Sequence, residues 1–246
     1  MITPQRPAAV ITGGGGGIGG AICANLARRG FAVSAWDVSE ASLQRTATAM
    51  AADGLDCHVT AVDVTDAGSI ATALVSTTAA TGAPSVLVHA AGQIDFCDFE
   101  DLDAARFRQM IDVHVLGAVL AMQAVIPSMV ERGYGRIVNF GSVAAFSGSA
   151  RHAHYAAAKG AIVAMSKALA KAYGKDGITI NCVAPGAIDT DMFAQVDETA
   201  MSYYSDNPVG RIGRPDDVAA AVAYLVGHDA GFVTGSVLHV NGGMYL

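Results

Sequence analysis

A run of glycines near the start of the chain is the feature that most constrains its fold. Residues 13–17 are all glycine; they follow a short apolar segment, residues 8–12, and precede a helical pattern over residues 18–29. Backbone N–H groups at the start of such a helix can approach the phosphates of a dinucleotide only where no Cβ intervenes. A flexible turn without a ligand is the alternative, but the position between a strand and a helix favours a dinucleotide site.

Short apolar runs alternate with helical patterns along the whole chain. The predicted strands are residues 8–12, 31–36, 57–62, 85–89, 136–140, 179–183 and 237–240, and the predicted helices are 18–29, 40–52, 69–81, 103–129, 155–173 and 215–226. Most of these strands are continuous apolar runs, typical of strands buried on both faces. We therefore expect an α/β fold: residues 1–246 form one Rossmann-like domain, a doubly wound parallel sheet of about seven strands with helices on both faces.

Composition excludes several classes of protein. Apolar residues make up 52% of the chain and charged residues 15%, which indicates a large core, and the net charge of -7 argues against nucleic-acid binding. The four cysteines are scattered and predict neither a metal site nor a disulfide framework. The first residues lack the pattern of a signal peptide, and lysines interrupt the Ala-rich stretch 156–173, so we expect a cytoplasmic protein without a membrane span.

Residues 189–213 have weak periodicity and include two tyrosines and Asn207-Pro208. This segment is predicted to be a mobile substrate flap beside the ligand crevice, with an irregular surface connection as the alternative.

Two aspartates after predicted strands bear on the cofactor. Asp37 ends the second strand, where a carboxylate can accept both ribose hydroxyls and repels a 2′-phosphate. Neither the glycine turn nor the residues just after Asp37 include Arg or Lys, so the sequence favours NAD(H) over NADP(H). A helix N-cap is the alternative role for Asp37, and both roles can coexist. Asp63 either pairs with the adenine amino group or serves as a turn aspartate.

Tyr155 and Lys159 lie one helical turn apart on one face of a predicted helix. A lysine beside a tyrosine favours the phenolate and makes the hydroxyl a usable proton donor near neutral pH. Such a pair is otherwise an ordinary amphipathic face. Combined with the glycine turn, it predicts hydride chemistry on a carbonyl or a secondary alcohol.

An ordered set of residues across nearly the whole chain resembles the short-chain dehydrogenase/reductase family. The matching residues are Thr12, Gly13, Gly17, Ile18, Gly19, Asp63, Val64, Ala90, Ala91, Gly92, Ser142, Tyr155, Lys159, Asn181, Pro185, Gly186 and Thr190. The resemblance implies that Tyr155 is the acid/base, that Ser142 orients and polarises the substrate oxygen, and that Lys159 lowers the pKa of the tyrosine and holds the nicotinamide ribose. No metal is needed for this chemistry.

The same resemblance, together with the reasoning on Asp37, gives a cofactor-binding set. It comprises Gly13, Gly16, Gly17, Ile18, Gly19, Asp37, Asp63, Val64, Ala90, Ala91, Gly92, Tyr155, Lys159, Pro185, Gly186, Ile188 and Thr190.

Two histidines depart from the family pattern. His89-Ala90 stands where the family usually has Asn-Asn, and His114 stands where it has the fourth catalytic residue, an Asn that anchors a water linking the lysine to solvent. His114 either carries protons in an altered relay or fills the space of the Asn inside a helix.

Within the family the chain is most similar to 3-oxoacyl-[acyl-carrier-protein] reductases. These mostly use NADPH and carry basic residues that dock the acidic carrier; here Gly133 and Asp176 occupy those positions, with Arg132 and Lys175 adjacent. We therefore expect a small ketone or secondary alcohol as substrate, with an acyl thioester as one option. The predicted substrate residues are Gln93, Ser142, Ala144, His152, Tyr155 and Met192.

Alternative activities remain open at this point. They are an NAD-dependent secondary-alcohol, 3-hydroxyacyl-CoA or hydroxysteroid-type dehydrogenase and, from another class, a non-catalytic dinucleotide sensor on the same fold. A nucleotide-sugar epimerase or dehydratase is disfavoured because little chain follows Gly213. The resemblance also implies a homotetramer built on the helices at about 113–129 and 156–172.

Overall fold

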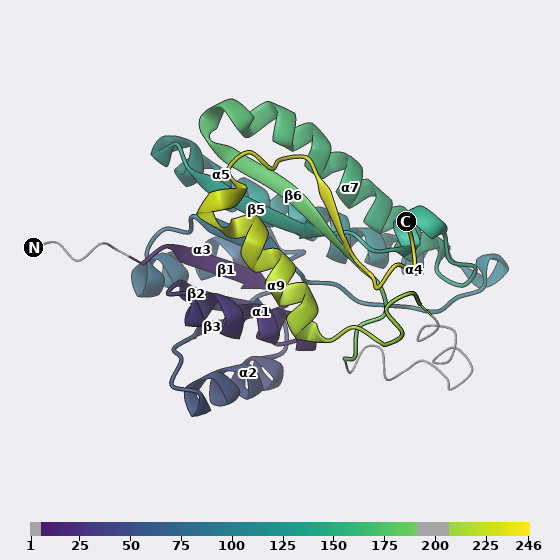
Figure 1. Ribbon diagram of the computed structural model, residues 1–246, viewed down its shortest axis with the longest axis horizontal. Helices are drawn as coiled ribbons and strands as arrows, with labels where there is room; N and C mark the ends of the chain where they lie inside the picture. The colour runs from purple at the N-terminus through teal and green to yellow at the C-terminus, as the bar shows by residue number, and fades with distance from the viewer. Residues whose placement is uncertain (1–5, 191–206) are drawn as a thin grey trace, which may run out of the picture.

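The computed structural model describes residues 6–190 and 207–246. Seven parallel strands form one sheet in the order β3-β2-β1-β4-β5-β6-β7 (Figure 1). The strands are β1 (Ala8–Thr12), β2 (Ala32–Asp37), β3 (His58–Ala61), β4 (Val86–His89), β5 (Gly135–Phe140), β6 (Ile178–Pro185) and β7 (Val237–Val240). The chain runs outward from β1 to β3 and then outward on the other side from β4 to β7, which confirms the predicted doubly wound parallel sheet.

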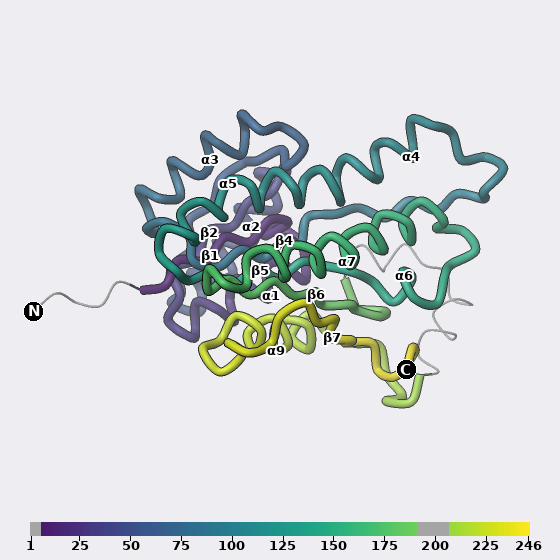
Figure 2. Tube along the Cα trace, turned by 90° about the horizontal axis from the view of Figure 1, so that it is seen from above, coloured from purple at the N-terminus to yellow at the C-terminus, as the bar shows by residue number. Residues whose placement is uncertain are grey.

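Helices cover both faces of the sheet. They are α1 (Gly17–Arg28), α2 (Glu40–Ala52), α3 (Ala67–Thr81), α4 (Ala104–Ile111), α5 (Gly117–Arg132), α6 (Ala144–Ser147), α7 (Ala153–Tyr173) and α9 (Pro215–Val226). Helices α1 and α9 pack on one face, and α3, α5 and α7 on the other (Figure 2). Two apolar cores, one on each side of the sheet, hold the three layers together.

The predicted helix over residues 103–129 is one continuous helical stretch, but its middle is not α-helical. A π-helical turn, Asp112–Leu116, joins α4 to α5. Gly117, which follows this turn, lies close to Val64: a Cβ at Gly117 would lie 2.9 Å from Val64 Cγ2. The turn places His114 inside the molecule, where it is 1% exposed.

By length and composition alone, the helical stretch Ala104–Arg132 could cross a membrane. Helix α5 within it packs against strands β4 and β5. Its apolar composition is therefore explained by its place in the second core.

The carboxyl ends of all seven strands lie along one edge of the sheet, because every pair is parallel. The glycine turn follows β1, Asp37 ends β2, and the segments after β4, β5 and β6 reach the same edge. Ligands bind at this edge in open α/β sheets.

The predicted flap, residues 189–213, is described only at its two ends, and residues 191–206 lie outside the described residues. An isolated bridge pairs Ile188 with Gly213, and Asp189 N–H donates to the Gly213 carbonyl at 2.9 Å. The segment therefore leaves and returns to the sheet edge at one place.

Candidate active site

The glycine turn is packed against the segment that follows β4. Gly13 has a φ of 69°, a left-handed conformation that favours glycine, and a Cβ there would lie 2.8 Å from the Ala90 carbonyl oxygen. A Cβ at Gly19 would overlap the carbonyl of Gly13. These two positions therefore require glycine for the turn to close.

Helix α1 begins at this turn with Gly16 as its N-cap. Within the described chain its first turn has no capping side chain and no carboxylate. The N–H groups at the start of α1 thus keep the positive end of the helix dipole available to an anion. Side chains at the glycine positions would fill the space in front of these N–H groups. Because glycines leave it open, the space fits the pyrophosphate of a dinucleotide.

Asp37 lies directly beside the glycine turn. Its Oδ2 accepts a hydrogen bond from Gly15 N–H at 3.1 Å, and its Oδ1 accepts one from Ser39 N–H at 3.0 Å. Ser39, not Asp37, caps helix α2, because Ser39 Oγ accepts from Ser42 N–H. Asp37 is therefore not the N-cap of α2. Its carboxylate lies at the glycine turn, where a ribose would lie.

Asp63 uses its carboxylate within its own turn. The Oδ1 atom accepts from Thr65 N–H at 2.9 Å and from Thr65 Oγ1 at 2.7 Å, and these bonds lower the pKa of Asp63. The following residue, Val64, is buried against Gly117. The turn-aspartate interpretation thus describes the contacts of Asp63 in this structure.

The segment after β4 is joined to β1 through Thr12. Ala91 N–H donates to Thr12 Oγ1 at 3.1 Å, and the same oxygen lies 2.9 Å from His89 Nδ1. Burial and the charge of Lys159 lower the pKa of His89 to about 3, so this imidazole is neutral. Thr12 Oγ1 therefore binds both His89 and Ala91, which fixes the segment after β4 at the end of β1.

The segment after β6 closes over the glycine turn from the other side. A Cβ at Gly17 would lie 3.0 Å from Thr190 Cγ2, and Gly186 N–H donates to the Val240 carbonyl at 3.0 Å. Pro185, the last residue of β6, precedes this segment. Asn181 has a different function: its side chain joins β6 to Val233 and Ser236.

A cavity of about 500 Å³ opens beside the turn. It brings together most of the predicted residues: Ile18, Ala90, Gly92, Gln93, His114, Ser142, Ala144, His152, Tyr155, Lys159, Pro185, Gly186, Ile188 and Thr190. Gly13, Gly16, Gly17, Gly19, Asp37, Asp63, Val64 and Ala91 are not among its lining residues. Met192 lies outside the described residues.

Tyr155, Ser142 and Lys159 meet in this cavity. Ser142 and Tyr155 both line the cavity, where Tyr155 is only partly exposed, and Ser142 Oγ accepts from Ala144 N–H at 3.2 Å. The sequence predicts that Lys159 lowers the pKa of Tyr155, but in this structure burial raises that pKa and only Ser142 opposes the rise. The phenol is therefore protonated at neutral pH and can donate its proton.

Lys159 is buried next to the tyrosine. Its Nζ donates to the Phe140 carbonyl at 2.9 Å and lies 5.6 Å from the centre of the Tyr155 ring. Burial lowers the pKa of Lys159 to about 8. The ammonium form still predominates at neutral pH, so a positive charge lies where a phenolate would form.

His114 contacts both the tyrosine and the segment after β4. Its Nε2 lies 2.9 Å from the Gln93 carbonyl oxygen, its ring meets the Tyr155 ring edge-on at 5.5 Å, and Gly92 lies against it. Burial, and next the charge of Lys159, lower the pKa of His114 to about 2. The imidazole therefore stays neutral and fixes Gln93 in the cavity wall.

Several residues that line the cavity were not predicted from the sequence, among them Phe96, Ser149 and Met244. Phe96 packs on His152 with ring centres 4.3 Å apart, and Ser149 Oγ lies 2.8 Å from His152 Nδ1. The spacing of Ser149 and His152 is a local signal that could have linked them. Phe96 and Met244 reach the cavity from other parts of the chain, and no short sequence pattern indicates them.

Comparison with known proteins shows the family to which the chain belongs. A family model described as "Enoyl-(Acyl carrier protein) reductase" matches residues 13–245. The chain is 37% identical to 2-(S)-hydroxypropyl-CoM dehydrogenase 3 of Xanthobacter autotrophicus, over 95% of this chain and 94% of that protein. It is 36% identical to the 3-oxoacyl-[acyl-carrier-protein] reductase of Escherichia coli, over 97% of each chain.

A solved structure shows the same architecture. Levodione reductase superimposes with a TM-score of 0.91 at 32% identity, covering 97% of each chain. The acetoacetyl-CoA reductase of Allochromatium vinosum is 35% identical over 97% of this chain and 98% of its own. This protein therefore belongs to the short-chain dehydrogenase/reductase family and is an NAD(P)-dependent oxidoreductase that acts on CH–OH groups.

Proposed function

We propose that this enzyme prefers NAD(H) and interconverts a small ketone and its secondary alcohol by chemistry like that of 3-oxoacyl-thioester reductases. The observation that supports the chemistry best is the meeting of Ser142, Tyr155 and Lys159 in one cavity beside the glycine turn. NAD(H), when bound, supplies or accepts the hydride.

The protein's residues handle the proton. In reduction, the Tyr155 hydroxyl gives its proton to the substrate oxygen as negative charge develops there, and in oxidation the phenolate takes that proton back. Ser142 donates a hydrogen bond to the same oxygen and orients it. The Lys159 ammonium stabilises the phenolate left on Tyr155, because it lies 5.6 Å from the ring in a buried setting.

His114 is assigned a positioning function, not that of a proton carrier. It is held at the Gln93 carbonyl, and its pKa of about 2 keeps it uncharged across the working range. Of the two sequence-based interpretations, these contacts favour the one in which the histidine fills the space of the family's Asn.

The preference for NAD(H) rests on Asp37. Its carboxylate lies at the glycine turn, where a 2′-phosphate would meet a negative charge. Arg45, on α2, is one guanidinium near this region; it donates to Ser42 Oγ at 2.9 Å. Steady-state kinetics with NADH and NADPH on one ketone test this preference, and a higher kcat/KM with NADPH would contradict it.

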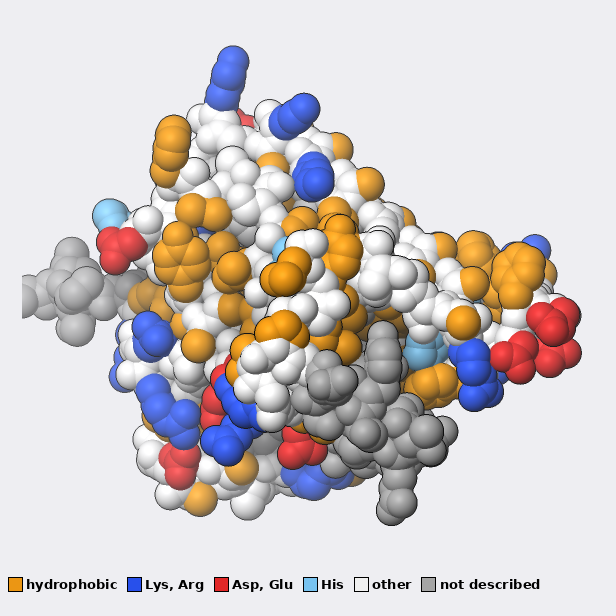
Figure 3. Space-filling view, turned by 45° about the vertical axis from the view of Figure 1, so that its right-hand side comes forward, with side chains coloured by type: hydrophobic (Ala, Val, Ile, Leu, Met, Phe, Trp, Pro, Cys, Tyr) orange, Lys and Arg blue, Asp and Glu red, His pale blue; other side chains and the backbone are white. Residues whose placement is uncertain are grey.

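Charge argues against an acidic carrier protein as the substrate donor. Exposed acidic side chains lie at one projecting end of the molecule (Figure 3), where the short helix η1 (Phe99–Asp101) follows the cavity residue Phe96. Arg132 and Lys175 are adjacent in sequence to the positions where carrier-protein reductases have their docking residues. They precede β5 and β6, at the opposite edge of the sheet. A free small molecule is therefore the favoured substrate.

Replacing the proton donor tests the mechanism. Tyr155→Phe removes only the hydroxyl, so turnover should fall by at least about a thousandfold while the affinity for NADH, measured by fluorescence titration, stays within about twofold. Retained turnover would refute the assignment. Intact NADH binding without turnover of any ketone by the unaltered enzyme would favour the dinucleotide sensor.

A further inference from the structure

The far wall of the cavity contains a polar side chain that the mechanism does not use. His152 lines the cavity and is 6% exposed. Its Nδ1 lies 2.8 Å from Ser149 Oγ, whereas its Nε2 is buried and has no hydrogen-bond partner among the described residues. A buried, unpaired imidazole nitrogen costs free energy that a suitably placed ligand atom would recover.

The imidazole is fixed in its orientation. Ser149 holds Nδ1, the Phe96 ring packs on one side at 4.3 Å, and the Tyr155 ring lies 6.0 Å away. Because the ring is restrained on several sides, Nε2 has a defined position relative to the reacting hydroxyl. The two rings are close enough for one small substrate to reach both.

The segment that carries Phe96 is also restrained. Asp95 forms a bidentate ion pair with Arg106, at 2.9 and 2.7 Å, and its Oδ2 lies 3.3 Å from His154 Nε2. Cys97 N–H donates to the Arg151 carbonyl at 3.0 Å. This wall of the cavity is therefore built before any substrate arrives.

Charged groups near the cavity do not favour an anionic substrate. Lys159 is the only lysine or arginine among the described lining residues, and it belongs to the chemical end. Arg106 and Arg151 pair with Asp95 and Asp98.

The sequence that follows Thr190 offers no cation either. Residues 191–206 contain Asp191, Asp197, Glu198 and Asp206 and no lysine or arginine. Among the described lining residues, a carboxylate, sulfonate or phosphate on the substrate would therefore lack a countercharge away from Lys159.

We infer that His152, oriented by Ser149, recognises a second, uncharged oxygen of the substrate, so that the substrate is a neutral ketone with another carbonyl or hydroxyl oxygen a few bonds from the reacting carbon. This inference rests on the proposed function. Burial, and next the nearby His154 and Arg151, lower the pKa of His152, so the ring meets that oxygen as a neutral imidazole.

Three probe substrates separate the two parts of the inference. Ethyl 3-oxobutanoate is neutral and has the second oxygen, heptan-2-one matches its chain length without it, and 3-oxobutanoate carries a negative charge. With NADH, the enzyme should reduce the ester with a kcat/KM about tenfold or more above those of the other two, mainly through KM.

Variants of His152 test its function in this selectivity. His152→Phe keeps an aromatic ring and should lose about tenfold on the ester while changing little on heptan-2-one. His152→Gln presents an amide at similar reach and should keep most of the preference. His228→Phe, at an exposed position, is the control that changes none of the three rates.

Folding is checked by NADH affinity and thermal melting. If His152→Phe proves unstable, Ser149→Ala should shift the selectivity in the same direction by a smaller factor, because it removes only the restraint on Nδ1. Equal rates on the ester and heptan-2-one, faster reduction of 3-oxobutanoate, no turnover of the ester, or unchanged selectivity in both variants would overturn the inference. Any turnover abolished by Tyr155→Phe would still leave the proposed function in place.

Discussion

At the scale of single residues, Asp37 is joined to the glycine turn by one backbone hydrogen bond from Gly15 N–H. Replacing it with serine removes the charge that opposes a 2′-phosphate and leaves Arg45 nearby, on α2. We expect Asp37→Ser to shift the ratio of kcat/KM for NADH over NADPH by about tenfold or more towards NADPH. Asp53→Ser, at an exposed ion pair with Arg28, is the matched control. An unchanged ratio in Asp37→Ser would show that the preference is set elsewhere.

Lys159 gives the enzyme a defined dependence on pH. Its pKa of about 8 lies below the usual 10.5, so the ammonium is present below pH 8 and is lost as the pH rises through that value. Ketone reduction should therefore decline above about pH 8 in a profile of kcat/KM. In Lys159→Arg the charge persists, and the decline should move to higher pH in any active variant. An additional inflection near pH 6.5 would contradict the neutral state assigned to His114.

The lowered pKa of Lys159 also affects stability. Whereas activity should fall as the pH rises, the free energy of unfolding should rise. The folded state disfavours the ammonium, so the unfolded chain binds more protons between about pH 8 and 10.5. The contribution of Lys159 to the free energy of unfolding therefore rises with pH through that window.

At the scale of elements, the glycine turn and the helix it begins behave as one unit. Gly13 has a positive φ and lies against the Ala90 carbonyl, so Gly13→Ala combines backbone strain with a steric clash. We expect a loss of about 1–3 kcal/mol in the free energy of unfolding, together with weaker NADH binding. Urea denaturation measures the first and fluorescence titration the second.

Gly160 provides the control for this prediction. It lies inside α7, and no described atom would lie within 4 Å of a Cβ there. Gly160→Ala should therefore be neutral or stabilise the protein by up to about 1 kcal/mol. Destabilisation by both substitutions to the same extent would show that the turn has no special requirement at Gly13.

Elements with local signals were predictable, and those set by distant contacts were not. The glycine turn and the pair Tyr155 and Lys159 follow from short spacings, and both lie where the sequence placed them. Helix α3 begins at Ala67, two residues before the predicted start, because Asp66 accepts from Gly68 N–H. A π-helical turn differs from an α-helix by one residue, so apolar periodicity over residues 103–129 did not indicate the turn at Asp112–Leu116.

The polar contacts of the cavity show the same limit. His114 bonds to the carbonyl of Gln93, 21 residues earlier, and Phe96 packs on His152 from another strand end. Such contacts depend on the arrangement of segments in space. The sequence indicated the residues that do the chemistry but not how the cavity wall around them is assembled.

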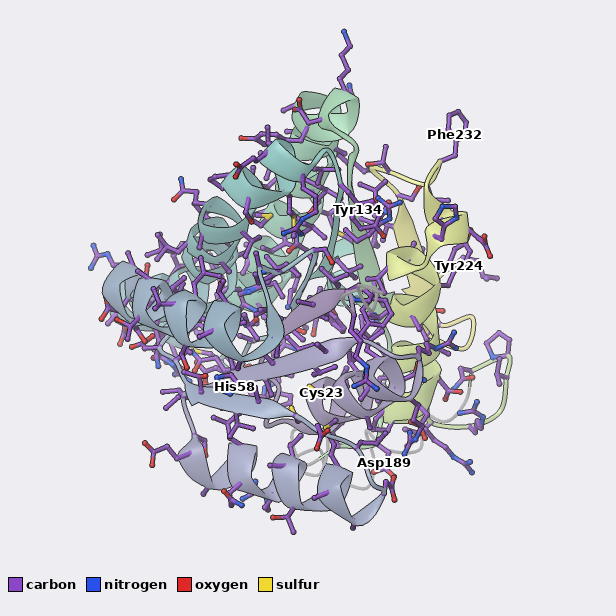
Figure 4. All side chains as sticks on the ribbon, turned by 90° about the vertical axis from the view of Figure 1, so that its left-hand side faces the viewer. Cys23, His58, Tyr134, Asp189, Tyr224 and Phe232 are labelled. Carbon is purple, nitrogen blue, oxygen red and sulfur yellow. The ribbon has the colours of Figure 1, made fainter. Side chains whose placement is uncertain are left out.

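At the scale of the whole molecule, apolar side chains project from the surface. Phe232 is fully exposed and Tyr224 is half exposed, and Figure 4 shows both standing out from the C-terminal part of the chain. Leu116 and Val130 are exposed on the long helical stretch Ala104–Arg132. We propose that these side chains are covered in a homotetramer.

Light scattering tests this assembly. The unaltered protein should have four times the mass of the 25.0 kDa chain. Phe232→Asp places a charge in the proposed contact and should lower the measured mass at micromolar concentration. Val75→Asp, on the exposed side of α3, is the control. A monomer in both proteins would contradict the proposal.

The sheet divides the site between two halves of the chain. The carboxyl ends of β1, β2 and β3 and the loops after them supply the glycine turn, Asp37 and Asp63, whereas the segments after β4 and β5 supply Phe96, Ser142 and His152. Asp37 and His152 share no described contact. In the assignments proposed above, the choice between NAD(H) and NADP(H) rests on Asp37 and the choice of substrate on His152, so either preference could drift during evolution, or be redesigned, while the other is kept.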